Sequence, residues 1–198
     1  MFIPRHPVVE NQFCSYGAQT SVTAGVGGVI AYAGSVVYLD STADNEEAVV
    51  FKMASGKTPF GFLMQKVKTG YHQVHPTGFF MPGDLGSSDA IAQPSYNSSG
   101  AINGTKAVPV GVAHLGIYDT VHYTSEDEVT ALLPGQTLYS AYDEAKVTNN
   151  STDYAAAGDG GKVDDTSVAR VMKGASAAKA TANIANTTLY PIRIKLLV

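Results

Sequence analysis

Hydrophobic and polar residues alternate most regularly at the end of the chain, over residues 189–198. Ile192, Ile194 and Leu196 fall on one side of an extended chain, whereas Arg193 and Lys195 fall on the other. This period of two predicts a β-strand with one buried face. We therefore expect the strand to be integral to a sheet, and its deletion to expose a face of the core.

A second pattern occurs twice, over residues 34–67 and, more loosely, over residues 135–173. Each copy has a turn glycine, an apolar run, a polar loop, a second apolar run and a Gly-Lys pair before a third apolar run. The runs are rich in the β-branched and aromatic residues that favour strands. The repetition predicts two pseudo-symmetric halves of one β-domain.

The fold predicted for the whole chain is all-β with little helix, built as a β-barrel or sandwich-like body. Its expected parts are an extended N-terminal arm at 1–13, a first β-rich half at 14–86, a loop or linker at 87–107 and a second β-rich half at 108–198. The linker assignment depends on a composition of Ser, Asn, Gly and Ala. Residues 175–185 contain six alanines but no apolar stripe, so we expect a loop there with room for one helical turn.

The N-terminal arm combines apolar residues with prolines. Pro4 and Pro7 prevent a helix and favour an extended chain. Such a segment either lies over a neighbouring molecule as an interaction strand or folds back on its own chain as the first edge strand. In the first case its apolar residues bind the partner. These residues are Phe2, Ile3, Pro4, Val8, Val9 and Phe13.

Composition and charge narrow the classes of partner. Charged residues make up 15% of the chain, below the roughly 25% usual for soluble domains, which predicts that a partner covers much of the surface. The net charge of −4 argues against nucleic-acid binding, because domains that bind nucleic acid usually carry a basic face. The chain has no apolar segment of ~20 residues and no signal-peptide pattern, so we expect no membrane partner and synthesis in a cytoplasm. Cys14 is the one cysteine and is predicted to be a small buried hydrophobe.

Residues that could bind a metal or carry catalysis are scattered. His72 and His75 are the best candidates for metal ligands, but positions three apart face opposite sides of a strand and no cysteine or carboxylate pair completes a shell. A Ser-His-Asp set can be drawn from a serine, His114 or His122, and Asp119, but no Gly-x-Ser-x-Gly elbow presents a nucleophile. We therefore predict no catalytic residue, no metal site and no cofactor, and leave the role of His72 and His75 open.

Six short motifs pair turn glycines or Gly-Lys dipeptides with apolar strands. They occupy residues 34–40, 56–57, 61–63, 134–138, 161–163 and 168–171. Together they resemble the head-decoration proteins of tailed bacteriophages. The resemblance implies a structural cement protein that binds the outer capsid surface and locks neighbouring subunits of the major capsid protein through an N-terminal arm and a β-rich body. It also implies a homo-oligomer, commonly a trimer with a dimer as the alternative, located on the capsid exterior of the virion after synthesis in the host cytoplasm.

Two other classes of function remain open. A tail- or fibre-associated binding module of a phage virion shares the β-rich composition with many Tyr, Asn and Gly residues. A hydrolase would need a pocket with convergent polar groups. On the capsid hypothesis, removal of residues 1–13 abolishes binding to assembled shells and leaves the body folded.

Overall fold

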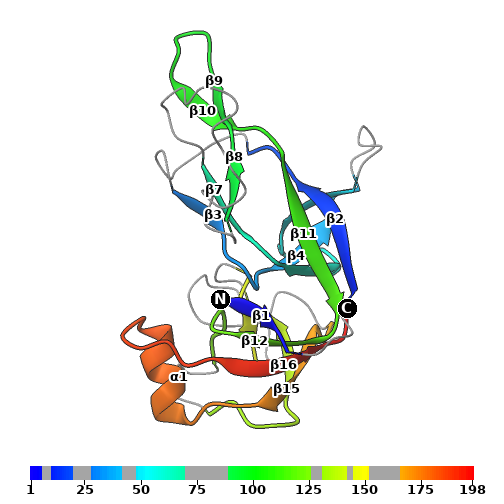
Figure 1. Cartoon of the computed structure of the whole chain (residues 1–198), viewed down its shortest axis with the longest axis vertical. Helices are drawn as coiled ribbons and strands as arrows, with labels where there is room; N and C mark the ends of the chain where they lie inside the picture. Colours follow the sequence, from blue (N-terminus) through cyan, green and yellow to red (C-terminus); the bar gives the residue numbers. More distant parts are fainter. Residues whose placement is uncertain are drawn as a thin grey trace.

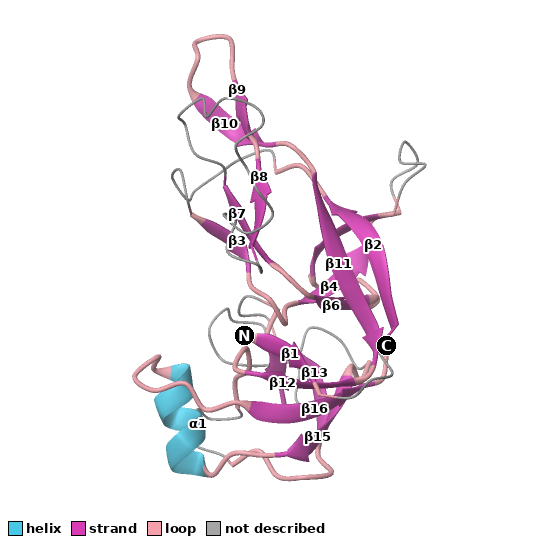
Figure 2. Cartoon of the chain, viewed as in Figure 1, coloured by secondary structure: helices cyan, strands magenta, loops and turns pink. Residues whose placement is uncertain are grey.

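Strands dominate the structure. The computed structural model describes residues 1–5, 10–19, 28–41, 48–69, 89–125, 131–141, 145–151 and 166–198. Within these ranges the single helix, α1 (Ala177–Ile184), is short, so the predicted all-β fold with a barrel-like body is confirmed. Figure 1 shows two groups of strands stacked along the long axis, and Figure 2 shows α1 (cyan) beside the lower group.

Five strands close the first barrel. In order around the ring they are β11 (Val108–Leu115), β2 (Glu10–Tyr16), β5 (Val49–Lys52), β4 (Val36–Leu39) and β6 (Gly61–Leu63). β11 pairs antiparallel with both β2 and β6, whereas β2 and β5 run parallel. Alternate side chains along barrel strands point inward. Those buried together in the barrel strands are Cys14, Tyr16, Val37, Val50, Leu63, Val110 and Val112. The prediction that Cys14 is a buried hydrophobe is confirmed.

A small sheet and a hairpin extend from this barrel. The sheet contains β3 (Val29–Ala31), β7 (Lys66–Thr69) and β8 (Asp89–Ala92), and the hairpin pairs β9 (Pro94–Tyr96) with β10 (Ile102–Thr105). The hairpin lies at one end of the molecule (Figure 1). The part of the predicted loop or linker that the structure describes, residues 89–107, therefore consists mainly of strands. Ala90 and Ala92 alternate into the barrel's apolar cluster, and residues this small gave little strand signal in the sequence.

The strands of the second unit follow the same cyclic order. β12 (Ile117–Thr120), β16 (Ile192–Leu196), β15 (Ala169–Lys173), β13 (Thr137–Ser140) and β14 (Val147–Thr148) lie side by side. A parallel bridge between Tyr123 and Val147 joins β14 to the segment that follows β12. An extra strand, β1 (Phe2–Pro4), pairs antiparallel with β12. The alternation predicted for β16 is confirmed, because its three aliphatic residues are buried and Lys195 is exposed.

The two predicted copies of the strand pattern form the same three-stranded unit. In the first copy β4 lies between β5 and β6, and in the second copy β13 lies between β14 and β15, with every pair antiparallel. In the first unit β11 and β2 complete the ring, and in the second β16 and β12 hold the corresponding places. The predicted pseudo-repeat is therefore confirmed, and it extends to five strands in each unit.

The turn that opens each copy has the same backbone geometry. Gly34 has a φ of 94° and Gly135 a φ of 89°, values that glycine adopts without the steric cost of a Cβ. The backbone N–H of Gly34 donates to Leu63 O at 2.7 Å, and that of Gly135 donates to Val171 O at 2.8 Å. Each glycine therefore joins the start of the first strand in its copy to the third.

A side chain also closes both turns in the same way. Tyr32 N–H donates to Ser35 Oγ at 3.3 Å in the first copy. Leu133 N–H donates to Gln136 Oε1 at 2.7 Å in the second. The residue types differ, so the two turns share a hydrogen bond without sharing the side chain that makes it.

The boundary between the units falls at Gly116, where φ is 131°. Residues 108–115 were predicted to belong to the second half, but β11 pairs with β2 and β6 of the first barrel. The units also differ in the elements after their third strand, which are β7 to β10 in the first unit and α1 in the second. Residues 89–107 are therefore part of an insertion in the first unit.

The helix α1 is longer than the single turn predicted for residues 175–185. It spans eight residues, and Ala180 and Asn183 are its buried side chains. Alanine has the highest intrinsic helix propensity, and these two positions, three apart, lie on one face. Packing of that narrow face stabilises a helix that has no broad apolar stripe.

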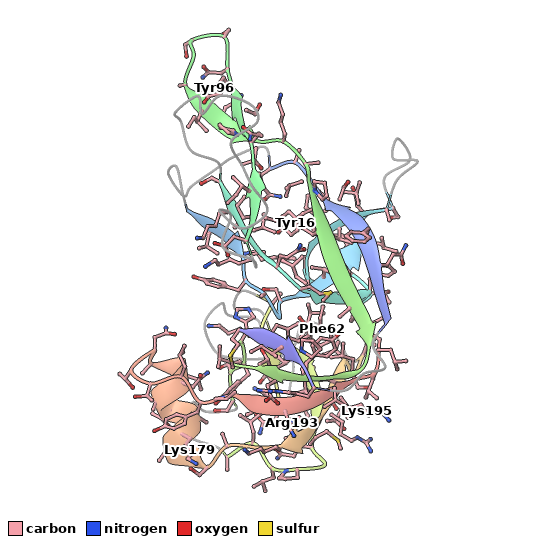
Figure 3. All side chains as sticks on the ribbon, in the orientation of Figure 1. Tyr16, Phe62, Tyr96, Lys179, Arg193 and Lys195 are labelled. Atoms are coloured by element: carbon pink, nitrogen blue, oxygen red, sulfur yellow. The ribbon has the colours of Figure 1, made fainter. Side chains whose placement is uncertain are left out.

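The larger apolar cluster joins the two units. Val36 and Phe62 contribute from the outer face of the first barrel, and Tyr118, Leu138 and Ile194 contribute from the second unit. Figure 3 shows Phe62 where the two groups of strands meet. Burial of this apolar surface provides the main attraction between the units.

Candidate functional site

The first strand of the predicted arm folds back on its own chain. Phe2 lies opposite Thr120 in the pairing of β1 with β12. Its ring stacks on Tyr118, with centroids 4.3 Å apart, and lies 5.8 Å from the ring of Phe62. For residues 2–4 the structure thus has the edge-strand arrangement, and the Phe2 side chain is part of the packing between the units.

The residues predicted to bind a partner differ in how far the structure exposes them. Ile3 and Pro4 are exposed on β1, and Phe13 is 86% exposed on β2. Phe2 is only partly buried, and its ring packs against the larger apolar cluster, so its role as a contact residue stays a prediction. Val8 and Val9 lie outside the described residues.

Two arginines fasten the arm to the sheet through one carboxylate. Asp119 lies on β12, and its side chain is only 10% exposed. Arg5 Nε lies 2.6 Å from Asp119 Oδ2, and Arg193 Nε lies 2.8 Å from Oδ1. The pKa of Asp119 is below its ordinary value, chiefly because of the hydrogen bond from Arg193, with Arg5 adding to it and burial opposing both. The carboxylate therefore stays charged and joins β1, β12 and β16.

No local pattern in the sequence predicts the cluster of Asp119, Arg5 and Arg193. Arg193 was placed correctly on the polar face of the last strand, but its partner depends on the register that sets Asp119 opposite Arg193. Arg5 adds a third position far away in the chain. Only the pairing of β12 with both β1 and β16 brings the three together.

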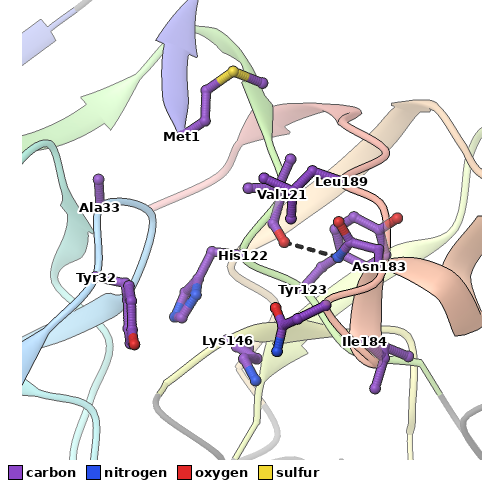
Figure 4. A pocket seen from close by; sticks show the side chains of 11 residues that line it. Met1, Tyr32, Ala33, Val121, His122, Tyr123, Lys146, Asn183, Ile184 and Leu189 are labelled. Carbon is purple, nitrogen blue, oxygen red and sulfur yellow. Dashed lines mark hydrogen bonds between the residues drawn. The ribbon is translucent and has the colours of Figure 1, made fainter.

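A cavity of about 490 Å³ lies near the end of β12. Figure 4 shows its lining, which comes from the turn before β4, the segment after β12, the residue before β1 and the end of α1. Asn183 Nδ2 donates to Val121 O at 2.9 Å, and Tyr123 Oη donates to Tyr190 O at 2.8 Å. Burial raises the pKa of Tyr123 to about 12. The first bond fixes α1, and the second fixes the segment after it, to the rim of the cavity.

The residues of the hypothetical Ser-His-Asp set do not converge as a triad. His122 Nε2 lies 3.0 Å from Ser35 Oγ, but Ser35 is fully buried. Asp119 is instead bound by the two arginines. His114 Nδ1 lies 2.8 Å from Phe60 O. The contact between Ser35 and His122 thus ties the turn of the first copy to the segment after β12.

The described residues contain no group of three or more His, Cys, Asp or Glu side chains that could hold a metal ion. His72 and His75 lie outside them. The helix seen in the described ranges is too short to cross a membrane. Comparisons of the chain with family models, curated proteins and solved structures gave no significant match.

Proposed function

We propose that the chain is a structural cement protein of a tailed-bacteriophage capsid, which binds the outer surface of the shell across neighbouring major-capsid subunits. The observation that carries the proposal is the position of the motifs on which the resemblance depends. Residues 34–40 and 61–63 form two strands of the first unit, and residues 134–138 and 168–171 form their counterparts in the second. The motifs thus describe one strand unit used twice.

The proposed activity is binding, and several properties of the chain support it. The buried polar groups around Asp119 and His122 connect strands of this chain to one another. Charged residues are few in the chain, and apolar side chains such as Ile3 and Phe13 are exposed. A cement protein needs contact area, because it stabilises the assembled shell by binding it more tightly than the free subunits.

Co-sedimentation tests this proposal. Purified protein is mixed with heads of its own phage that lack the chain, and with purified tails, and each mixture is centrifuged. We expect saturable binding to heads and added resistance of the heads to heat. Binding to tails alone would favour the tail- or fibre-associated module, and absence from both pellets would contradict the proposal.

A test of the arm's role requires a shorter truncation than the removal of residues 1–13. Residues 10–13 belong to β2, which pairs with β11 in the wall of the first barrel, so removal of residues 1–13 would damage the body as well as the arm. Removal of residues 1–5 takes away Met1, β1 and Arg5 and leaves β2 complete. The melting temperature of that variant must be measured beside its binding to heads, because β1 also contributes to the fold.

A further inference from the structure

Positive charge gathers on the outer face of the sheet in the second unit. The pairings of β1, β12, β16 and β15 align outward side chains in two rows across the strands. One row contains Ile3, Asp119, Arg193 and Lys173, and the other contains Arg5, Ile117, Lys195 and Arg170. We call these eight residues the cationic face. Figure 3 shows Arg193 and Lys195 on β16 at this sheet.

Like charges lie directly opposite each other on this face. Arg170 is paired with Lys195, and Lys173 with Arg193. Such cross-strand pairs destabilise a sheet, and Asp119, the carboxylate within the two rows, is already bound by Arg5 and Arg193. Arg170, Lys173 and Lys195 are exposed and make no ion pair with any residue that the structure describes. The fold alone gives no reason for this arrangement.

The face also differs from the rest of the chain in its charge. It holds five of the 13 lysines and arginines and one of the 17 acidic residues. The face is therefore net positive, whereas the whole chain has a net charge of −4. A concentration of charge opposite in sign to that of the whole protein indicates an oppositely charged partner.

Apolar side chains within and beside the rows favour a protein as that partner. Ile3 is 37% exposed, and Met172, next to Lys173, is 48% exposed. Arginine and methionine are enriched at protein interfaces. A nucleic acid is disfavoured because the acidic chain as a whole would repel a polyanion.

We propose that the cationic face docks on an acidic patch of a protein surface. This inference deepens the proposed function and rests on it for the identity of the partner, the outer surface of the capsid. Arg5 and Arg193 hold β1 in place, and Arg170, Lys173 and Lys195 supply the charges that meet carboxylates of the shell. The repulsion within the face is relieved when those carboxylates come between the opposed cations.

Two double variants test the proposal with equal changes of net charge. The first, Arg170→Glu with Lys195→Glu, reverses two exposed charges on the cationic face and keeps a like-charge pair. The control, Lys57→Glu with Lys106→Glu, reverses two exposed lysines of the first unit. Binding to heads is measured by co-sedimentation at 50 and 500 mM salt. We expect the first variant to bind at least about tenfold more weakly than wild type, the control to bind like wild type, and wild-type binding to weaken at high salt.

A single variant separates binding from folding. Arg170→Glu alone places a carboxylate opposite Lys195, so its melting temperature is expected to rise by roughly 1–3 °C while its affinity for heads falls. A purely structural role for these residues would not produce opposite changes in stability and affinity.

The outcomes distinguish this inference from the proposed function. If wild type and both double variants bind heads equally, the docking surface is wrong and the cement function stands. If wild type does not bind heads, the cement function fails, and immobilised poly-L-glutamate becomes the probe. Retention of wild type but not of the cationic-face variant then supports recognition of an acidic protein surface, and equal retention overturns it. Tighter binding to duplex DNA than to poly-L-glutamate also overturns it.

Discussion

The substitution Phe2→Ala tests whether the N-terminal strand is docked in the free protein. The ring of Phe2 is partly buried against the larger apolar cluster and stacks on Tyr118 with an angle of 6° between the planes. Truncation of a fully buried phenylalanine costs about 3–5 kcal/mol, and an aromatic pair adds about 0.5–1.5 kcal/mol to the area term. Because Phe2 keeps some exposure, we expect a loss of roughly 2–3 kcal/mol in the free energy of unfolding.

Urea denaturation followed by circular dichroism measures this loss. The matched control is Ile3→Ala, on the same strand but facing outward, for which we expect a change of about 0.5 kcal/mol or less. In thermal melts the Phe2 variant should unfold roughly 4–12 °C below wild type, given about 2–4 °C per kcal/mol for a chain of this size. If both variants lose less than about 0.5 kcal/mol, β1 is not docked, and the contact with Tyr118 does not hold the arm in solution.

Three further predictions concern single positions. Asp119→Asn should destabilise the chain at neutral pH by about 1–3 kcal/mol. Because the pKa of Asp119 is lowered in the folded state, the stability advantage of wild type is full above about pH 4 and disappears as the pH falls through that lowered pKa. Urea titrations from pH 7 to pH 2 would detect this loss. Gly34→Ala should lower the free energy of unfolding more than Gly135→Ala. Both positions have positive φ, which costs a residue with a Cβ about 1–2 kcal/mol, but a Cβ at Gly34 meets Thr120 Oγ1 at 2.9 Å whereas one at Gly135 meets no atom within 4 Å. Equal melting temperatures of the two variants would refute this prediction. Gly174→Ala makes its Cβ clash with the backbone oxygen of Leu132, so we expect a sharp fall in soluble yield, and normal expression with unchanged melting would contradict it.

The sequence alone predicts the elements that neighbouring residues define, namely single strands and tight turns. The last strand was predicted because Ile192, Ile194 and Leu196 alternate with charged residues, and this alternation directly reflects a sheet with one buried face. The duplicated unit was predicted from Gly34 and Gly135 because a turn that needs positive φ favours glycine in both copies.

The remaining features depend on pairing between distant segments. Strand 108–115 looked like the start of the second half, because no local property shows that its partners are β2 and β6. The site around Asp119 was missed for the same reason, since its two arginines are 114 and 74 residues away in sequence. The contact between Ser35 and His122 was anticipated only as one of many pairings of a serine with a histidine. Its role as a tie between the units came from the fold.

Because β1 pairs with a strand of the second unit, we expect the two units to stay associated without the covalent link between them. This strand precedes the first barrel in the chain, yet it completes the sheet of the second unit. Scission of the backbone after Gly116 would therefore yield two pieces, 1–116 and 117–198, that still share an exchanged strand and a common apolar cluster. We expect these pieces to reassemble when they are produced separately, as the halves of a split protein do, because β1 of the first piece pairs with β12 of the second.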